Sequence, residues 1–239
     1  FVTIAKRLPR YFKKLRLMSL IQKDTLYWKK LIPYELSNNK TFKTSNSSLF
    51  LKKLDDTKEF KEIFNQDSII SRSDDITQNN MRIFGKRVKY NGKFPNWHHS
   101  IDISSNWPLL EENKINYHDY INYGDPRYAW ELNRFLHFSD LSRAYWITKN
   151  NTYAERMCLE IGNWIKTNPF MYGINWKEGI EVSLRSINWI FAYHFFSKSS
   201  SFEKIEDKFI ESLYLHGYYL NENLSDKWSL NNNHIIAEL

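Results

Sequence analysis

Apolar side chains recur at helical spacing through the second half of the chain. Asp125 and Pro126 form a typical helix start, a capping side chain followed by proline, and the pattern predicts one helix from there to about Ile147. Further helices are predicted over residues 152–166, 176–196 and 202–222, and from about residue 232. Successive helices with short connections form antiparallel hairpins, so we expect a mainly α fold, a solenoid or an α/α toroid.

The first half is patterned differently. Residues 4–31 carry apolar side chains at helical spacing with Lys and Arg between them, which predicts a basic amphipathic helix broken near Pro9. This helix either packs on the rest of the protein or makes a peripheral contact with an anionic membrane. Residues 35–80 are rich in Asn, Ser, Thr and Lys, with helical fragments such as 49–64, so we expect irregular and partly mobile structure there.

A small β element is predicted ahead of the helical part. Asn91-Gly92 lies between short alternating runs in residues 87–94, which predicts a β-hairpin that turns at this dipeptide. We therefore divide the chain into a basic arm with a small α/β lead-in, residues 1–94, and helical hairpins over residues 95–239. Residues 95–125 mix aromatic residues with turn formers and are too long for a simple connector, so we expect them to be functional or packed on the helices.

Composition narrows the function classes. The net charge is +7, but residues 1–61 hold 15 Lys and Arg against 5 Asp and Glu, while residues 62–239 hold 19 against 22. The basic excess thus belongs to the arm, and without a zinc-finger or RNP pattern we expect no nucleic-acid partner. The single cysteine, Cys158, excludes an internal disulfide and a cysteine-based metal site, and no cofactor or metal is predicted.

Targeting signals are not informative. No apolar run approaches the roughly 18 residues that span a membrane. No signal peptide is visible in residues 1–30, although the chain begins with Phe1 rather than Met, so the compartment stays open. Aromatic residues make up 17% of the chain, which suits either sugar stacking or a crowded helical core.

Several polar residues could carry chemistry. Asn133 and His137 are i and i+4 in the first predicted helix, so they should share a face. Glu181 and Arg185 form an i,i+4 pair in the third. Alone, such patterns are explained by an ion pair and a hydrogen-bonded core histidine.

Three asparagines run into His234 near the end of the chain. They form a helix cap on the simplest interpretation. A helix start favours neutral imidazole, which a base requires, and Glu238 one turn later could orient the ring.

A series of short motifs follows one order along residues 95–239. They are Trp97-His98, Trp107-Pro108, Tyr123-Gly-Asp125, Tyr128-Ala-Trp-Glu-Leu-Asn-Arg134, His137, Asp140-Leu, Arg143-Ala-Tyr145, Tyr153-Ala154, Asn168-Pro169, Gly173-Ile-Asn175-Trp176, Glu181, Arg185, Asn188-Trp189 and Asn232-Asn-His234 with Glu238. In this order they resemble the first toroid helices of the heparinase II/III-like polysaccharide lyases. Residues 1–90 match less clearly, and their arm resembles the start of members associated with surface-polysaccharide gene clusters.

The resemblance implies an incomplete α/α toroid followed by a C-terminal antiparallel β domain. It also implies β-elimination of a uronate-containing polysaccharide such as heparan sulfate or alginate. Asn233 would neutralise the uronate carboxylate, and His234 would assist it or act as the base. The residues predicted to bind the substrate are Trp130, Asn133, Arg134, His137, Asn175, Trp176, Glu181 and Arg185.

The family's tyrosine acid is expected further along a complete chain, and the periplasm is the compartment that degradative members favour. We therefore expect this sequence to be an N-terminal portion that lacks the rest of the toroid and the β domain and is inactive alone. A non-catalytic carbohydrate-binding or assembly module in surface-polysaccharide production is the alternative. A hydrolase that uses Glu131 and Glu181 as its two carboxylates is a third hypothesis.

Overall fold

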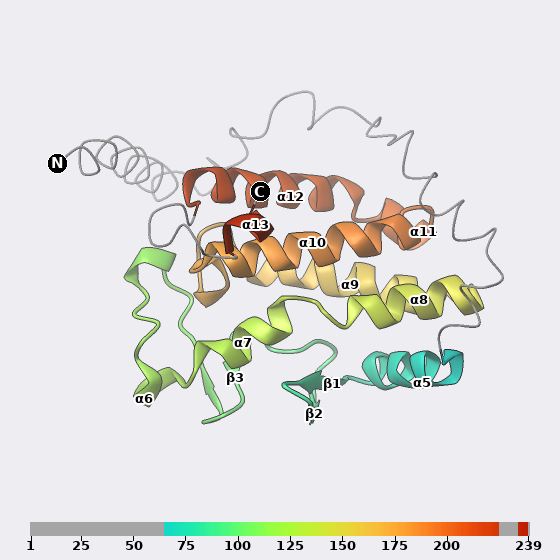
Figure 1. The fold of residues 1–239 in the computed structure, drawn as a ribbon, viewed down its shortest axis with the longest axis horizontal. Helices are drawn as coiled ribbons and strands as arrows, with labels where there is room; N and C mark the ends of the chain where they lie inside the picture. Colours follow the sequence, from blue (N-terminus) through green and yellow to red (C-terminus); the bar gives the residue numbers. More distant parts are fainter. Residues whose placement is uncertain (1–64, 225–233, 239) are drawn as a thin grey trace.

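The computed structural model describes residues 65–224 and 234–238 of the chain. Long helices lie roughly antiparallel to one another, and two small β-hairpins lie along one side of them (Figure 1). The mainly α prediction is thereby confirmed. The predicted basic helix over residues 4–31 and the fragment over 49–64 lie outside the described residues.

Within residues 65–224 and 234–238, helices account for most of the elements, and two of the helical elements are single 3-10 turns. In chain order they are α5 (Gln66–Thr77), η2 (Glu112–Lys114), α6 (Tyr120–Tyr123), α7 (Pro126–Asn133), α8 (Phe138–Thr148), α9 (Asn151–Thr167), η3 (Ile174–Trp176), α10 (Gly179–Phe196), α11 (Ser200–Glu203), α12 (Glu206–Glu222) and α13 (His234–Glu238). Helix α8 packs on α9 and α10, and α10 packs on α12 and α13. The predicted antiparallel hairpins are therefore present.

Side-chain caps explain where two of these helices begin. The Asp125 carboxylate accepts a hydrogen bond from the Arg127 amide at 2.9 Å, and proline occupies the first turn of α7. The Asn150 side chain accepts from the Thr152 amide at 3.0 Å and caps α9 in the same way. The predicted start of the first helix is confirmed.

The single helix expected from Asp125 to Ile147 is wrong, because the chain breaks between α7 and α8. Phe135 has a φ of +57°, a left-handed conformation that is costly for a bulky residue. Its ring is fully buried and stacks on Trp97 at 5.1 Å. Burial of this ring offsets the backbone strain, and it also separates Asn133 and His137, which therefore do not share a helix face.

The first hairpin forms ahead of its predicted position. Strand β1 (Asn80–Ile83) pairs antiparallel with β2 (Lys86–Lys89), and the turn is Phe84-Gly85, where both φ angles are positive. A two-residue hairpin loop requires such angles. Met81 and Ile83 are buried and fix this register, so Asn91-Gly92 follows the hairpin instead of forming its turn. A second hairpin joins β3 (His99–Ser100) to β4 (Ser105–Asn106).

Helix α5 was not predicted as such, since residues 35–80 were expected to be irregular. Asn65 caps it by accepting from the Ser68 amide at 3.0 Å, and its apolar side packs on α8. Buried side chains of α5 and β1 belong to the same core as the long helices. The division into two domains at residue 94 stays a prediction.

Many of the aromatic residues in the described part of the chain belong to the core. Trp164 contacts Trp176 and Trp189 with ring centroids 5.8 and 5.4 Å apart, and all three are almost completely buried. Among residues 65–224 and 234–238, no helix combines the length and apolar character that crossing a membrane requires.

Candidate functional site

Helix α13 presents His234 at its first residue, beside the start of α10. The His234 side chain is exposed, whereas Glu238 at the other end of α13 is buried. A Cβ on Gly179 would lie 2.6 Å from Glu238 Oε1, so glycine at this position lets the carboxylate approach the start of α10. Asn233 lies outside the described residues, and the prediction that Glu238 orients the imidazole stays a prediction.

Glu178 immediately precedes α10 and lies near His234. Burial raises the pKa of the Glu178 carboxyl above its ordinary value. The charges of Lys177 and His234 act in the opposite direction, which places His234 within electrostatic reach of this carboxyl. A titratable carboxyl and an imidazole therefore lie near each other where α10 and α13 begin.

Tyr117 lies close to Lys177 and Glu178. Burial raises its pKa, and the nearby Glu178 charge adds to the shift. Lys177 lies over the Tyr117 ring, with Nζ 5.8 Å from the centroid. These contacts join the start of α10 to the segment before α6.

An aromatic cavity of about 460 Å³ adjoins Tyr117. Its lining combines rings, carboxylates and one guanidinium: Asp102, Tyr117, Tyr120, Asp125, Pro126, Arg127 and Trp130. Tyr120 is exposed, and the indole of Trp130 donates to the Ile174 carbonyl at 3.0 Å. Rings beside hydrogen-bonding groups suit a sugar, which has apolar faces and hydroxyl edges.

Sequence analysis missed Tyr117, Tyr120, Arg127 and Lys177 as site residues. The available signal was the concentration of aromatic residues and turn formers over 95–125, which was expected to be functional or packed. Of the predicted substrate-binding residues, only Trp130 lines this cavity.

Arg134 and Glu181 are brought together by the break after α7. Arg134 donates from Nε and Nη2 to the two Glu181 oxygens at 2.7 and 2.6 Å, and from Nη1 to Glu131 at 2.9 Å. The hydrogen bonds that Arg134 donates to Glu181 raise the pKa of Arg134, against the effect of burial. This bidentate pair ties the end of α7 to α10.

The same contacts bear on the hydrolase hypothesis. Glu131 and Glu181 bind one guanidinium, and their side chains are only 16% and 4% exposed. A glycosidase needs two carboxylates that flank a cleft, one of which holds a proton. The geometry gives that hypothesis no support.

Asn133 and Asn175 both hold the backbone of Trp97. Their side-chain nitrogens donate to the Trp97 carbonyl at 2.7 and 3.0 Å, and Asn133 also accepts from the Trp164 indole at 2.6 Å. Both asparagines are buried. The prediction that they bind substrate stays a prediction, and their visible contacts support the fold.

Arg185 lies in the core, and the i,i+4 pair expected with Glu181 is wrong because that carboxylate binds Arg134. The Arg185 guanidinium lies 4.2 Å from the Trp164 ring centroid and 5.3 Å from that of Trp176, and its Nε donates to His216 Nε2 at 2.8 Å. Burial lowers the pKa of Arg185 to about 9. Trp176, predicted to bind the substrate, is likewise only 2% exposed.

His216 is expected to make folding sensitive to acid. Burial, and then the Arg185 charge, lower its pKa well below the ordinary value. Neutral His216 therefore stabilises the fold above the unfolded pKa near 6.5, and this stability is lost as the pH falls below it, by up to about 1.4 kcal/mol per pH unit. Urea unfolding at pH 7 and pH 5 measures the loss.

His216→Gln keeps an acceptor for Arg185 but cannot titrate. Its free energy of unfolding should fall between pH 7 and pH 5 by about 2 kcal/mol less than that of the wild type. His118→Gln removes an exposed histidine and should leave the wild-type acid loss unchanged. Equal acid losses in wild type and His216→Gln would contradict this role.

His137 lies away from His234, at the start of α8. Its Nε2 is 2.6 Å from Glu160 Oε2, and Arg156 Nε donates to the other oxygen of this carboxylate. Burial opposes ionisation of Glu160, but His137 and Arg156 together hold its pKa below the ordinary value. His137 thus helps to compensate a buried charge, and the prediction that it binds substrate stays a prediction.

Residues 65–224 and 234–238 contain neither a candidate metal site nor a reactive thiol. No group of three or more His, Cys, Asp or Glu side chains there is placed to hold a metal ion. Cys158 is buried, and burial raises the pKa of its thiol to about 12, which leaves it unreactive.

Solved structures of two lyases share this fold. The crystal structure of heparan sulfate lyase HepC from Pedobacter heparinus matches with a TM-score of 0.54 and 18% identity, over 72% of this chain and 24% of that one. The heparinase III-BT4657 gene product matches with a TM-score of 0.54 and 19% identity, over 73% of this chain and 28% of that one. The chain thus spans about a quarter of the length of these structures.

The predicted toroid-like helical fold is confirmed by these likenesses. No curated protein sequence matches the chain. A family model described as Heparinase II/III N-terminus matches residues 29–239, and the chain belongs to this family.

Proposed function

We propose that this chain forms part of a polysaccharide lyase that cleaves a uronate-containing polysaccharide by β-elimination. The observation that carries the proposal is the position of His234, exposed at the first residue of α13 and within electrostatic reach of Glu178. Family membership supports the reaction class.

The chemistry assigns the roles. The proton on C5 of a uronate is adjacent to the carboxylate, and its removal places additional negative charge on that group. The Asn233 amide neutralises this charge, and His234 takes the proton or assists its removal. The electron pair of the C5–H bond forms the C4–C5 double bond while the C4–O bond breaks, and an acid protonates the leaving oxygen.

The aromatic cavity gives the polysaccharide a place to bind beside this chemistry. Tyr117 joins the cavity to Lys177 and Glu178, so a saccharide stacked on its rings extends towards His234. Arg127 is a cation on the rim, 71% exposed and paired with Asp125. We propose that this surface holds sugars next to the one that is cleaved.

Absorbance of the product tests the proposal. The full-length protein that contains this sequence should produce an ultraviolet-absorbing unsaturated uronate from heparan sulfate or from alginate. The rate on the two polymers identifies which uronate is accepted. Absence of the chromophore with both polymers, and with other uronate polymers, would contradict the proposed reaction.

The alternative is a carbohydrate-binding module without catalysis, which the aromatic cavity also favours. Trp130 lies on that cavity, so saccharide binding should change tryptophan fluorescence. A fluorescence response to a uronate oligosaccharide without formation of a double bond would favour the binding module. Both signals together favour the lyase.

A further inference from the structure

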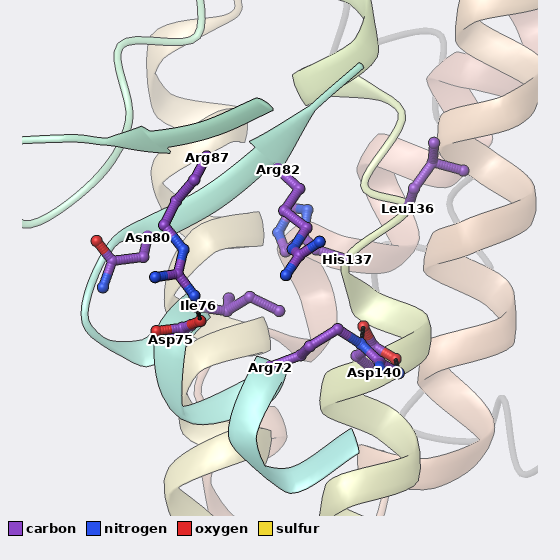
Figure 2. A pocket seen from close by; sticks show the side chains of 9 residues that line it. All are labelled: Arg72, Asp75, Ile76, Asn80, Arg82, Arg87, Leu136, His137 and Asp140. Atoms are coloured by element: carbon purple, nitrogen blue, oxygen red, sulfur yellow. Dashed lines mark hydrogen bonds and ion pairs between the residues drawn. The ribbon is translucent and has the colours of Figure 1, made fainter. Parts of the chain in front are cut away.

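A second polar cavity lies on the opposite side of the helical body from α13, between α5, the β1–β2 hairpin and the turn that joins α7 to α8 (Figures 1 and 2). Its volume is about 180 Å³. The lining contains three arginines, one histidine and two aspartates: Arg72, Arg82, Arg87, His137, Asp75 and Asp140. None of the residues of the aromatic cavity contributes to it.

Both aspartates of this cavity are neutralised by two of its arginines. Arg72 donates from Nε and Nη2 to the two oxygens of Asp140 at 2.8 and 2.9 Å. Arg87 donates to Asp75 at 2.6 Å. Figure 2 shows one pair on each side of the cavity. The two pairs leave the charge of the third arginine uncompensated.

Arg82 is that third arginine. It is exposed on β1, and within residues 65–224 and 234–238 its guanidinium has no carboxylate or hydrogen-bond partner. Its neighbours Met81 and Ile83 are 2% and 1% exposed, so the strand holds Arg82 at a fixed place on the cavity. The imidazole that also lines this cavity, His137, already has a hydrogen-bond partner in Glu160.

A guanidinium without a carboxylate partner, carried by an anchored strand beside a cavity whose acids are neutralised, suits an oxyanion. Guanidinium presents parallel N–H groups that match two oxygens of a sulfate or carboxylate. The neighbouring Arg72 and Arg87 remain bound to their own carboxylates, so the net positive charge of the cavity comes from Arg82.

We propose that the Arg82 cavity binds an oxyanion, sulfate or carboxylate, carried by an acidic polysaccharide. The identity of the polymer rests on the proposed function, whereas the oxyanion chemistry rests on the cavity alone. Because the cavity lies apart from His234, it would hold a region of the polymer away from the sugar that is cleaved.

Binding by Arg82→Gln tests the assignment. Isothermal titration calorimetry measures the affinity of the 239-residue chain for a heparan sulfate oligosaccharide, an alginate oligosaccharide and inorganic sulfate. Comparison of the three affinities shows whether the site prefers sulfate or carboxylate. Arg82→Gln should weaken binding of the preferred oligosaccharide about tenfold or more, because a hydrogen-bonded charge is lost. Arg82→Lys should recover only part of the affinity, since an ammonium lacks the planar fork.

Lys86→Gln is the matched control. Lys86 is an exposed cation on β2, it pairs with Ile83 in the hairpin, and it does not line the cavity. Its loss should change affinity less than twofold, and thermal unfolding should be unaltered in both glutamine variants. Equal losses from Arg82→Gln and Lys86→Gln would overturn the proposal, as would the absence of binding to all three probes.

His234→Ala separates this site from the lyase proposal. It should abolish elimination by the full-length protein and leave binding at the Arg82 cavity unchanged. If elimination is absent but Arg82→Gln still weakens binding, the oxyanion site stands and the lyase proposal fails. If elimination occurs but Arg82→Gln and Lys86→Gln bind equally well, the lyase proposal stands and the oxyanion site fails.

Discussion

Replacing His234 by alanine is expected to slow elimination by about 10²–10³-fold in the full-length protein, the cost of removing one group that acts where charge develops. The imidazole is exposed on α13, so the free energy of unfolding should change by less than about 0.5 kcal/mol. Initial rates of double-bond formation, measured at saturating polysaccharide, test the effect on the chemical step.

Asn233→Ala should produce a loss of similar size, because the amide is proposed to neutralise the same carboxylate. His99→Ala, on β3, is a control for histidine loss away from the site and should retain the wild-type rate. Wild-type rates in both Asn233→Ala and His234→Ala would reject the assignment of these residues.

Replacing Arg134 by methionine is expected to destabilise the fold by about 3–5 kcal/mol. Glu181 is only 4% exposed, and without Arg134 its buried charge has lost the guanidinium that binds both of its oxygens. The midpoint of urea unfolding at pH 7 should fall accordingly, with little change in the slope.

Two comparisons isolate this ion pair. The double variant Arg134→Met, Glu181→Gln should recover most of the loss, because the unpaired charge is gone. Lys114→Met breaks an exposed pair with Glu111, in which the lysine side chain is 56% exposed, and should cost less than about 1 kcal/mol. An Arg134→Met loss no larger than that of Lys114→Met would contradict the structural role.

The helical part of the fold could be predicted because its signals are local. Asp125 and Pro126 identify the start of α7, and apolar spacing identifies α9, α10 and α12. The break at Phe135 could not be predicted, since its positive φ is stabilised by rings far away in the sequence, Trp97 and Trp189 among them. The position of the first hairpin was predicted wrongly for a related reason, because the burial of Met81 and Ile83 determines its register.

The candidate site could be predicted only in part. Motif order led to His234, but spacing alone paired Glu181 with Arg185. The structure pairs Glu181 with Arg134, 47 residues away, and Arg185 with His216, 31 residues away. Such partners depend on how helices pack. The Arg82 cavity could not be predicted from the sequence for the same reason. One of its ion pairs, Arg72 with Asp140, joins residues separated by 68 positions.

The central claim is that the chain contributes to an elimination site, and mass balance of the products tests it most directly. Cleavage of a defined uronate oligosaccharide by the full-length protein should give two fragments whose masses add up to that of the substrate. The new non-reducing end should carry the double bond. Fragments whose masses add up to the substrate plus one water would show hydrolysis and contradict the account.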